Sequence, residues 1–102
     1  MKIYTIEYSK DVQDDLMGIK QYIKHNLHEP QIAEKIVDKI IEKINSIKFN
    51  PKIYPVIDED GIRKLKVRKL IVGNYIVFYM IEQDKIQITR ILHKKRNWIN
   101  LI

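Results

Sequence analysis

The clearest pattern of apolar positions lies in the stretch Tyr75–Glu82, which reads YIVFYMIE. Apolar side chains occupy both alternating sets of positions, so a strand formed here is covered by protein on both faces. Such a strand is typical of the centre of a sheet. The flanking stretches Lys66–Val72 and Ile86–His93 are also strand-like and join it through short links of turn-forming residues. The pattern predicts a three-strand antiparallel meander.

The first half of the chain changes from an alternating pattern to helical spacing. Lys2–Tyr8 alternates in the manner of a strand, and Ser9 follows as a suitable N-cap for a helix. Pro30 suits the first turn of a second helix, which ends near Asn50. The apolar stripe of the first helix comprises Val12, Leu16, Ile19, Tyr22, Ile23 and Leu27. That of the second comprises Ala33, Ile36, Val37, Ile40, Ile41, Ile44 and Ile47.

The element order is therefore strand, helix, helix and three strands in a single domain, residues 1–102. Neither helix can hide its apolar stripe alone, so we expect an α+β two-layer sandwich, β-α-α-β-β-β, with the helical hairpin packed on one face of an antiparallel sheet. Lys52–Ile62 contains two punctuating residues, Pro55 and Gly61, and is expected to be a loop. In the C-terminal tail KKRNWINLI, Trp98 and Leu101 are expected to dock on the body.

Charge is distributed unevenly along the chain. Residues 1–62 carry nine Lys and Arg against eleven Asp and Glu, a net of −2, whereas residues 63–102 carry ten against two, a net of +8. A basic half indicates an acidic or polyanionic partner, although lysine-rich coding also produces basic proteins. The absence of cysteine suits a reducing cytoplasm, and no stretch resembles a signal peptide or is long enough to span a membrane. We expect a cytoplasmic protein that does not act at a membrane.

Familiar motifs for metals and cofactors are missing from the sequence. The acidic stretch Asp58–Gly61 does not fit a calcium loop, because the first and last ligand positions would fall on Val56 and Val67. His25 and His28 lie near a helix end with Glu29 as the only close carboxylate, which is typical of surface histidines. No phosphate-binding glycine loop or zinc motif occurs. The sequence therefore predicts no cofactor, no metal and no small-molecule substrate.

Candidate chemistry is confined to basic residues of the meander and tail. These residues are Arg68, Arg90, His93, Lys94, Lys95 and Arg96. Neighbouring strand ends could bring Arg68 and His93 together, with Tyr79 near them. Arginine stabilises phosphorane charge and histidine moves a proton, so metal-free RNA cleavage is one interpretation. The other is that these cations bind an anionic partner or form a solvated edge, and the residue types alone favour this second interpretation.

Four segments occur in an order and at spacings that resemble one protein family. They are YSKDVQDDLMGIKQYI, the proline-headed second helix, RKLIVGNYIVFYMI and ITRILHKKRNW. Together they resemble the RelE/ParE family of toxins from bacterial type II toxin–antitoxin systems, over nearly the whole chain. The resemblance implies the same two-layer fold, growth inhibition by the free toxin, and a cognate antitoxin that wraps the toxin with a helix and extended segments.

The family has two branches with different targets. One branch cleaves mRNA in the ribosomal A site with basic residues of the sheet and the C-terminus. For that branch the resemblance implies a metal-independent endoribonuclease with Arg68, His93 and Arg96 as catalytic residues. The other branch acts on DNA gyrase. In either case Arg90, Lys94, Lys95, Tyr79 and Trp98 are expected to contact the target or nucleic acid.

Particular residues favour the gyrase-directed branch narrowly. Leu70 and Ile76 stand where the nuclease branch tends to place Lys and Arg, and apolar side chains cannot stabilise phosphorane charge. The pattern L-H-x-x-R-x-W, from Leu92 to Trp98, is closer to the gyrase-directed branch. The mRNA endonuclease remains the alternative, with ribosome and mRNA as its target. A second alternative, motivated only by the +8 half, is a non-toxic basic module that binds nucleic acid.

Overall fold

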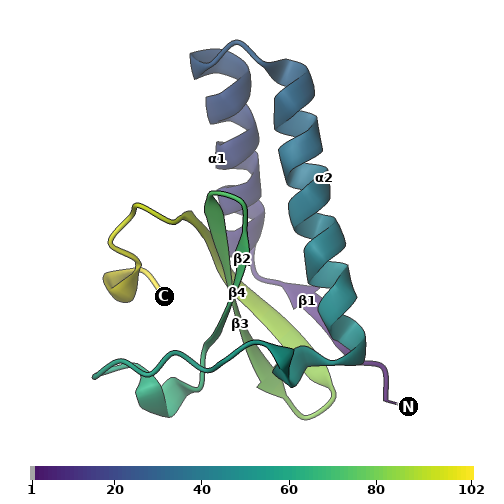
Figure 1. Cartoon of the computed structure of the whole chain (residues 1–102), viewed down its shortest axis with the longest axis vertical. Helices are drawn as coiled ribbons and strands as arrows, with labels where there is room; N and C mark the ends of the chain where they lie inside the picture. The colour runs from purple at the N-terminus through teal and green to yellow at the C-terminus, as the bar shows by residue number, and fades with distance from the viewer. Residues whose placement is uncertain (1) are drawn as a thin grey trace.

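Two long helices lie on one side of a four-stranded sheet in the computed structural model, which describes residues 2–102 (Figure 1). The helices and strands follow the predicted order: β1 Thr5–Tyr8, α1 Lys10–Asn26, α2 Pro30–Ser46, β2 Arg68–Val72, β3 Tyr75–Glu82 and β4 Lys85–His93. Short 3-10 turns occupy parts of the connections and the tail. The two-layer α+β architecture with a helical hairpin on one face is confirmed.

The sheet has the strand order β1-β4-β3-β2 and is mixed, not wholly antiparallel as predicted, because β1 pairs with β4 in parallel. The antiparallel meander is confirmed, with β3 paired on both sides. β1 joins at the other edge of β4 and runs parallel to it, from Thr5 opposite Lys85 to Tyr8 opposite Ile88. Two antiparallel helices of 17 residues each return the chain to the end of the sheet where β1 began. As a result β2 and β4 run in the direction of β1.

The observed strand ends differ from the predicted ones where the backbone departs from extended geometry. The predicted strand from Lys66 begins at Arg68, because Lys66 has a φ of +56°, in the left-handed region that a strand cannot contain. The predicted strand from Lys2 begins at Thr5. In β4, opposite the Phe78/Tyr79 step, the pairing passes from Ile88 to Arg90, and the extra residue Thr89 forms a bulge.

The helix starts follow the chemistry of their first residues. Ser9 has an extended backbone and its Oγ accepts a hydrogen bond from the Val12 amide at 3.1 Å, which caps α1 as predicted. Pro30 occupies the first turn of α2, where its missing N–H costs no helical hydrogen bond.

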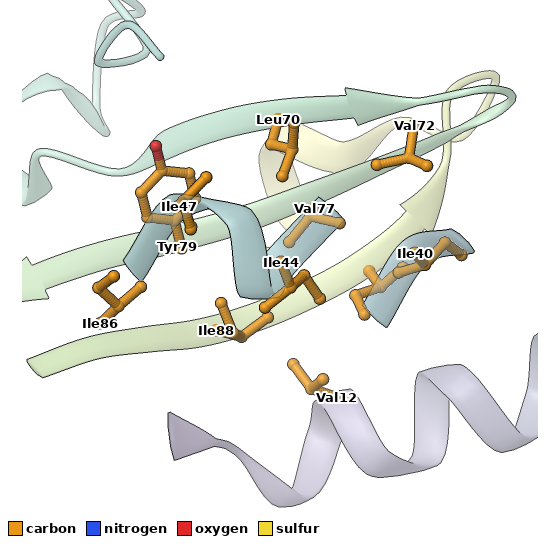
Figure 2. Close-up of a cluster of buried hydrophobic side chains, with 11 residues drawn as sticks. Val12, Ile40, Ile44, Ile47, Leu70, Val72, Val77, Tyr79, Ile86 and Ile88 are labelled. Atoms are coloured by element: carbon orange, nitrogen blue, oxygen red, sulfur yellow. The ribbon is translucent and has the colours of Figure 1, made fainter. Parts of the chain in front are cut away.

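The main hydrophobic core lies between the hairpin and the sheet (Figure 2). α1 contributes Val12, and α2 contributes Ile40 and Ile44, all fully buried. From the sheet come side chains of β2, β3 and β4, among them Leu70, Val72, Val77, Tyr79, Ile86, Ile88 and Ile91. Burial of this apolar surface is what holds the two layers together.

The opposite face of the sheet carries a second, smaller core. Phe78, Ile76 and Leu92 point to this side and are covered by residues of the 57–67 connection and by the tail. Trp98 packs on Phe78 with ring centroids 5.4 Å apart. Leu101 packs on the same cluster, so the predicted docking of the tail is confirmed. This face is therefore apolar and covered.

The distal part of the hairpin extends past the sheet, and two residues predicted to be buried there are exposed. The link between α1 and α2 lies beyond the end of the sheet (Figure 1). Tyr22 is 55% exposed and Leu27 is 54% exposed, whereas Ile23 is buried. The prediction that Tyr22 and Leu27 widen the buried stripe is wrong, because the distal part of α1 lies at and beyond the end of the sheet, which covers it only in part.

Candidate target-binding site

A turn of four residues, His93–Arg96, begins at the last residue of β4 and is called the cationic turn below. Three backbone donors fix it: Lys94 N–H to the Asn74 carbonyl at 2.8 Å, Lys95 N–H to His93 Nδ1 at 3.1 Å, and Arg96 N–H to the His93 carbonyl at 3.0 Å. The side chains of Lys94, Lys95 and Arg96 are exposed. Within residues 2–102 none of these three cations has an ion-pair partner. The turn therefore presents three free positive charges on a defined backbone.

Beside the turn lies a groove of about 530 Å³ between α1 and the end of the sheet. Its walls are mainly apolar and aromatic, with acidic residues from α1 on one side and basic residues from the cationic turn on the other. The lining residues are Asp14, Asp15, Gly18, Ile19, Tyr22, Tyr75, Ile91, Leu92, His93, Lys95 and Arg96. The rings of Tyr75 and His93 meet edge to face at 5.4 Å. Burial, and secondarily the nearby Tyr22, raises the pKa of the Tyr75 hydroxyl, so this group is a neutral hydrogen-bond donor at pH 7. The groove suits an amphipathic segment of a protein partner.

Arg90 is not part of the free cationic surface. Its guanidinium binds both carboxylate oxygens of Asp15, at 2.8 and 2.9 Å, and donates to the Leu101 carbonyl at 3.1 Å. The hydrogen bonds from Arg90 to Asp15 raise the pKa of the guanidinium above its usual value. The sequence predicted that Arg90 contacts the target, but its guanidinium is already bound to intramolecular partners.

Arg68 lies far from the cationic turn. It stands opposite Tyr79 on β3, whereas His93 stands opposite Tyr75, four positions further along the same strand. At ~3.3 Å per residue and ~4.8 Å per strand spacing, Arg68 and His93 are separated by about 13 Å along the sheet and about 10 Å across it. The expectation that these strand ends meet is wrong, because β2 and β4 lie on opposite sides of β3 and run in the same direction.

Arg68 and Tyr79 instead hold the connection that follows α2. The Arg68 guanidinium donates to the carbonyls of Tyr54 at 2.5 Å and Lys52 at 3.3 Å. The Tyr79 hydroxyl is buried and donates to the Pro51 carbonyl at 2.7 Å. Burial raises the pKa of Tyr79 to about 12. The expectation that Tyr79 contacts a target directly is wrong for this conformation, since its side chain is fully enclosed.

Trp98 lies at the edge of the second core. One part of its ring packs on Phe78, and Lys69 Nζ lies 5.4 Å from its ring centroid. The side chain is half-buried, so part of the indole remains accessible to a partner. Of the residues proposed for the site, the structure thus brings together His93, Lys94, Lys95 and Arg96, and leaves Arg68, Tyr79, Arg90 and Trp98 outside this group.

Several groove residues could not be found from the sequence pattern. Asp15 reads as part of a polar helix face, and its partner Arg90 lies 75 positions further along the chain. Tyr22 reads as part of the apolar stripe of α1. The pattern around Tyr75 indicates only a strand residue. The one available signal is an aromatic residue at the start of the central strand, which antiparallel pairing with the next strand places opposite His93.

Neither a metal-ligating cluster nor a membrane-spanning helix occurs in the described part of the chain. Among the described residues there is no group of three or more His, Asp or Glu side chains arranged to hold a metal ion. No helix between residues 2 and 102 is long and apolar enough to cross a membrane.

Comparison with known proteins identifies the class. Residues 6–98 match the family model described as the ParE toxin of type II toxin–antitoxin systems, parDE. The chain belongs to this family, which confirms its resemblance to RelE/ParE toxins. A comparison with curated proteins gives no significant match.

Two solved structures share the fold. The chain is similar to a chain of the chromosomal ParDE system from P. aeruginosa, with a TM-score of 0.73 and 21% identity, covering 89% of this chain and 96% of that one. It is also similar to a chain of the RelBE2 toxin–antitoxin complex from Mycobacterium tuberculosis, with a TM-score of 0.65 and 16% identity, covering 89% of this chain and 98% of that one.

Proposed function

We propose that this ParE-family toxin, when free of its antitoxin, inhibits growth by acting on DNA gyrase in the cytoplasm. The observation that carries the proposal is the cationic turn: Lys94, Lys95 and Arg96 are exposed, unpaired and held on a fixed backbone beside a groove. Such a surface binds a macromolecule through charge and shape, without needing a cleavage site.

Two apolar positions weigh against mRNA cleavage. Leu70 and Ile76, which stand where the nuclease branch tends to carry Lys and Arg, are 1% and 5% exposed. Leu70 belongs to the main core and Ile76 to the second core on the other face. Neither position can hold a cation without disrupting a core. Arg68 is also remote from His93, so the three residues of the nuclease hypothesis do not meet in one site.

The antitoxin is proposed to occupy the groove and cover the cationic turn. Its apolar lining, including Ile19, Tyr22 and Tyr75, fits the apolar face of an amphipathic segment. Acidic residues on that segment would complement Lys95 and Arg96 at the rim. The two similar structures come from toxin–antitoxin systems, ParDE and RelBE2, which supports a partner of this kind.

The ribosome-dependent endonuclease is kept as the second candidate because His93 and Arg96 lie within one turn. A histidine could move a proton from a ribose hydroxyl while an arginine stabilises the phosphorane. The two residues share a hydrogen bond between the Arg96 amide and the His93 carbonyl, so their relative position is defined. This arrangement supplies two of the groups that metal-free cleavage needs.

Expression in a bacterial host tests both candidates. The chain alone should arrest growth, and co-expression with the antitoxin encoded beside it should restore growth. Arrested cells should show DNA-damage signalling and intact mRNA by primer extension. Cuts at ribosomal A sites that disappear in Arg96→Ala would favour the endonuclease. Harmless expression of the folded chain would exclude both and leave the non-toxic nucleic-acid-binding module, whose binding should fall steeply with salt.

A further inference from the structure

The open edge of β4 is closed by a side chain where no strand is present. β1 pairs with β4 only as far as Ile88, and at Ser9 the chain turns into α1. Further along β4, the Asp15 carboxylate accepts a hydrogen bond from the Ile91 amide at 3.0 Å. Asp15 therefore satisfies a backbone donor that a continuing strand would have bound.

The same carboxylate fixes Arg90 through a bidentate ion pair. The side chains of Arg90 and Asp15 are only 21% and 11% exposed, so water screens the pair little. The remaining Nη1 group of Arg90 donates to the Leu101 carbonyl. One carboxylate on α1 is thus connected, through one guanidinium, to the last residues of the chain.

These contacts hold both ends of the segment that carries the cationic turn. Its start is fixed at Ile91 by Asp15, and its end at Leu101 by Arg90. Between them lie residues 93–96 and Trp98, which packs on Phe78. We propose that Asp15 is a positioning residue: it holds Arg90, and through Arg90 the tail, so that the cationic turn is presented to its target in one conformation. This inference rests on the proposed function, and it identifies Asp15 and Arg90 as the residues that preorganise the target-binding surface.

Trp98 is the only tryptophan in the chain, so its fluorescence reports directly on the tail. Three variants are compared with the wild type. Asp15→Asn keeps the size of the side chain and removes its charge, and Arg90→Lys keeps the charge and loses the planar fork. Asp38→Asn is the matched control, because Asp38 is exposed on α2 and forms no ion pair within the described chain. The readouts are quenching of Trp98 by acrylamide and growth inhibition per amount of folded toxin.

Asp15→Asn and Arg90→Lys should both make Trp98 more accessible to acrylamide, and Asp15→Asn should weaken growth inhibition about tenfold, the factor expected for loss of a charge-assisted hydrogen bond. Asp38→Asn should match the wild type in both readouts. Circular dichroism establishes that each variant is folded at the temperature used. If Asp15→Asn does not fold, the quenching and growth inhibition of Arg90→Lys test the positioning role.

Unchanged Trp98 quenching in the folded variants would overturn the positioning role, and so would a released tail with full growth inhibition. A wild-type chain that does not inhibit growth would instead refute the proposed function. In that case the quenching comparison alone decides whether Asp15 holds the tail.

Discussion

Arg68 and Tyr79 face each other across β2 and β3, and both bind carbonyl groups of the same connection after α2. Tyr79 holds Pro51 and Arg68 holds Tyr54, so the two side chains act together to attach this segment to the sheet. The contacts are intramolecular and partly or fully shielded from water. Arg68 is therefore expected to contribute to stability, and its loss to affect activity only through the amount of folded protein.

Substitution of Arg68 tests this assignment. Arg68→Ala should lower the free energy of unfolding by about 1–3 kcal/mol, because the part-buried Tyr54 carbonyl loses a charged donor. Arg68→Lys should lower the free energy of unfolding by a smaller amount, since the ammonium can still reach one carbonyl. Urea denaturation measures both changes, and growth inhibition per folded molecule should stay at the wild-type level. A stable Arg68→Lys variant without toxicity would show that Arg68 acts on the target after all.

Tyr79 should make stability depend on pH in the alkaline range. Its pKa is raised to about 12 in the folded chain, whereas an unfolded tyrosine titrates near 10. Between these values the unfolded chain has released the proton and the folded chain has kept it. The stabilisation is complete below pH ~10 and is lost as pH rises toward ~12, by up to about 1.4 kcal/mol per pH unit.

Tyr79→Phe removes this titration and the hydrogen bond to Pro51. At pH 8 the variant should be less stable by about 0.5–1.5 kcal/mol. Above pH 10 its stability should fall less steeply than that of the wild type. Burial also raises the pKa of Tyr8 and Tyr75, so the slope should decrease without vanishing. Urea denaturation at several pH values gives both curves, and parallel curves would contradict the assignment.

Gly18 offers a test of the groove that separates stability from binding. It lies within α1 and lines the groove, and a Cβ added there meets no atom within 4 Å. Gly18→Ala should therefore raise stability by about 0.5–1 kcal/mol, because alanine is the better helix former. Gly18→Leu projects a larger side chain into the groove and should weaken antitoxin binding about tenfold or more, as expected for a clash within an interface.

Titration calorimetry with the purified antitoxin measures this difference. Gly18→Ala serves as the control, since it changes the helix and adds only one methyl group to the groove wall. Equal antitoxin affinity for the wild type and Gly18→Leu would place the antitoxin elsewhere on the toxin.

The sequence was informative where one residue and its near neighbours decide the structure. Tyr75–Glu82 was predicted with its observed bounds because apolar positions of both parities allow only a doubly covered strand. Ser9 and Pro30 marked the helix starts by their own hydrogen-bonding chemistry. Lys94, Lys95 and Arg96 were candidates from their residue types alone, and their side chains are exposed in the structure.

What depended on distant parts of the chain could not be predicted in the same way. Whether Arg68 meets His93 is decided by strand order and register, which the meander pattern alone does not give. The engagement of Arg90 depends on an aspartate in the first helix. The exposure of Tyr22 depends on how far the hairpin extends beyond the sheet, a property of two elements together.

The proposed target makes the cationic turn sensitive to charge reversal. Arg96→Glu and Lys95→Glu should each reduce target binding and growth inhibition strongly, since an attractive charge becomes a repulsive one. The inhibition should also weaken with increasing salt, because the exposed cations are screened. Lys39→Glu on the exposed face of α2 is the matched control and should behave as the wild type.

The most direct measurement is inhibition of DNA supercoiling by purified gyrase, with the wild-type chain, Arg96→Glu and Lys39→Glu compared at equal amounts of folded protein. The wild type and Lys39→Glu should inhibit supercoiling, and Arg96→Glu should not. Unimpaired supercoiling in the presence of a wild-type chain that still arrests growth would contradict action on gyrase.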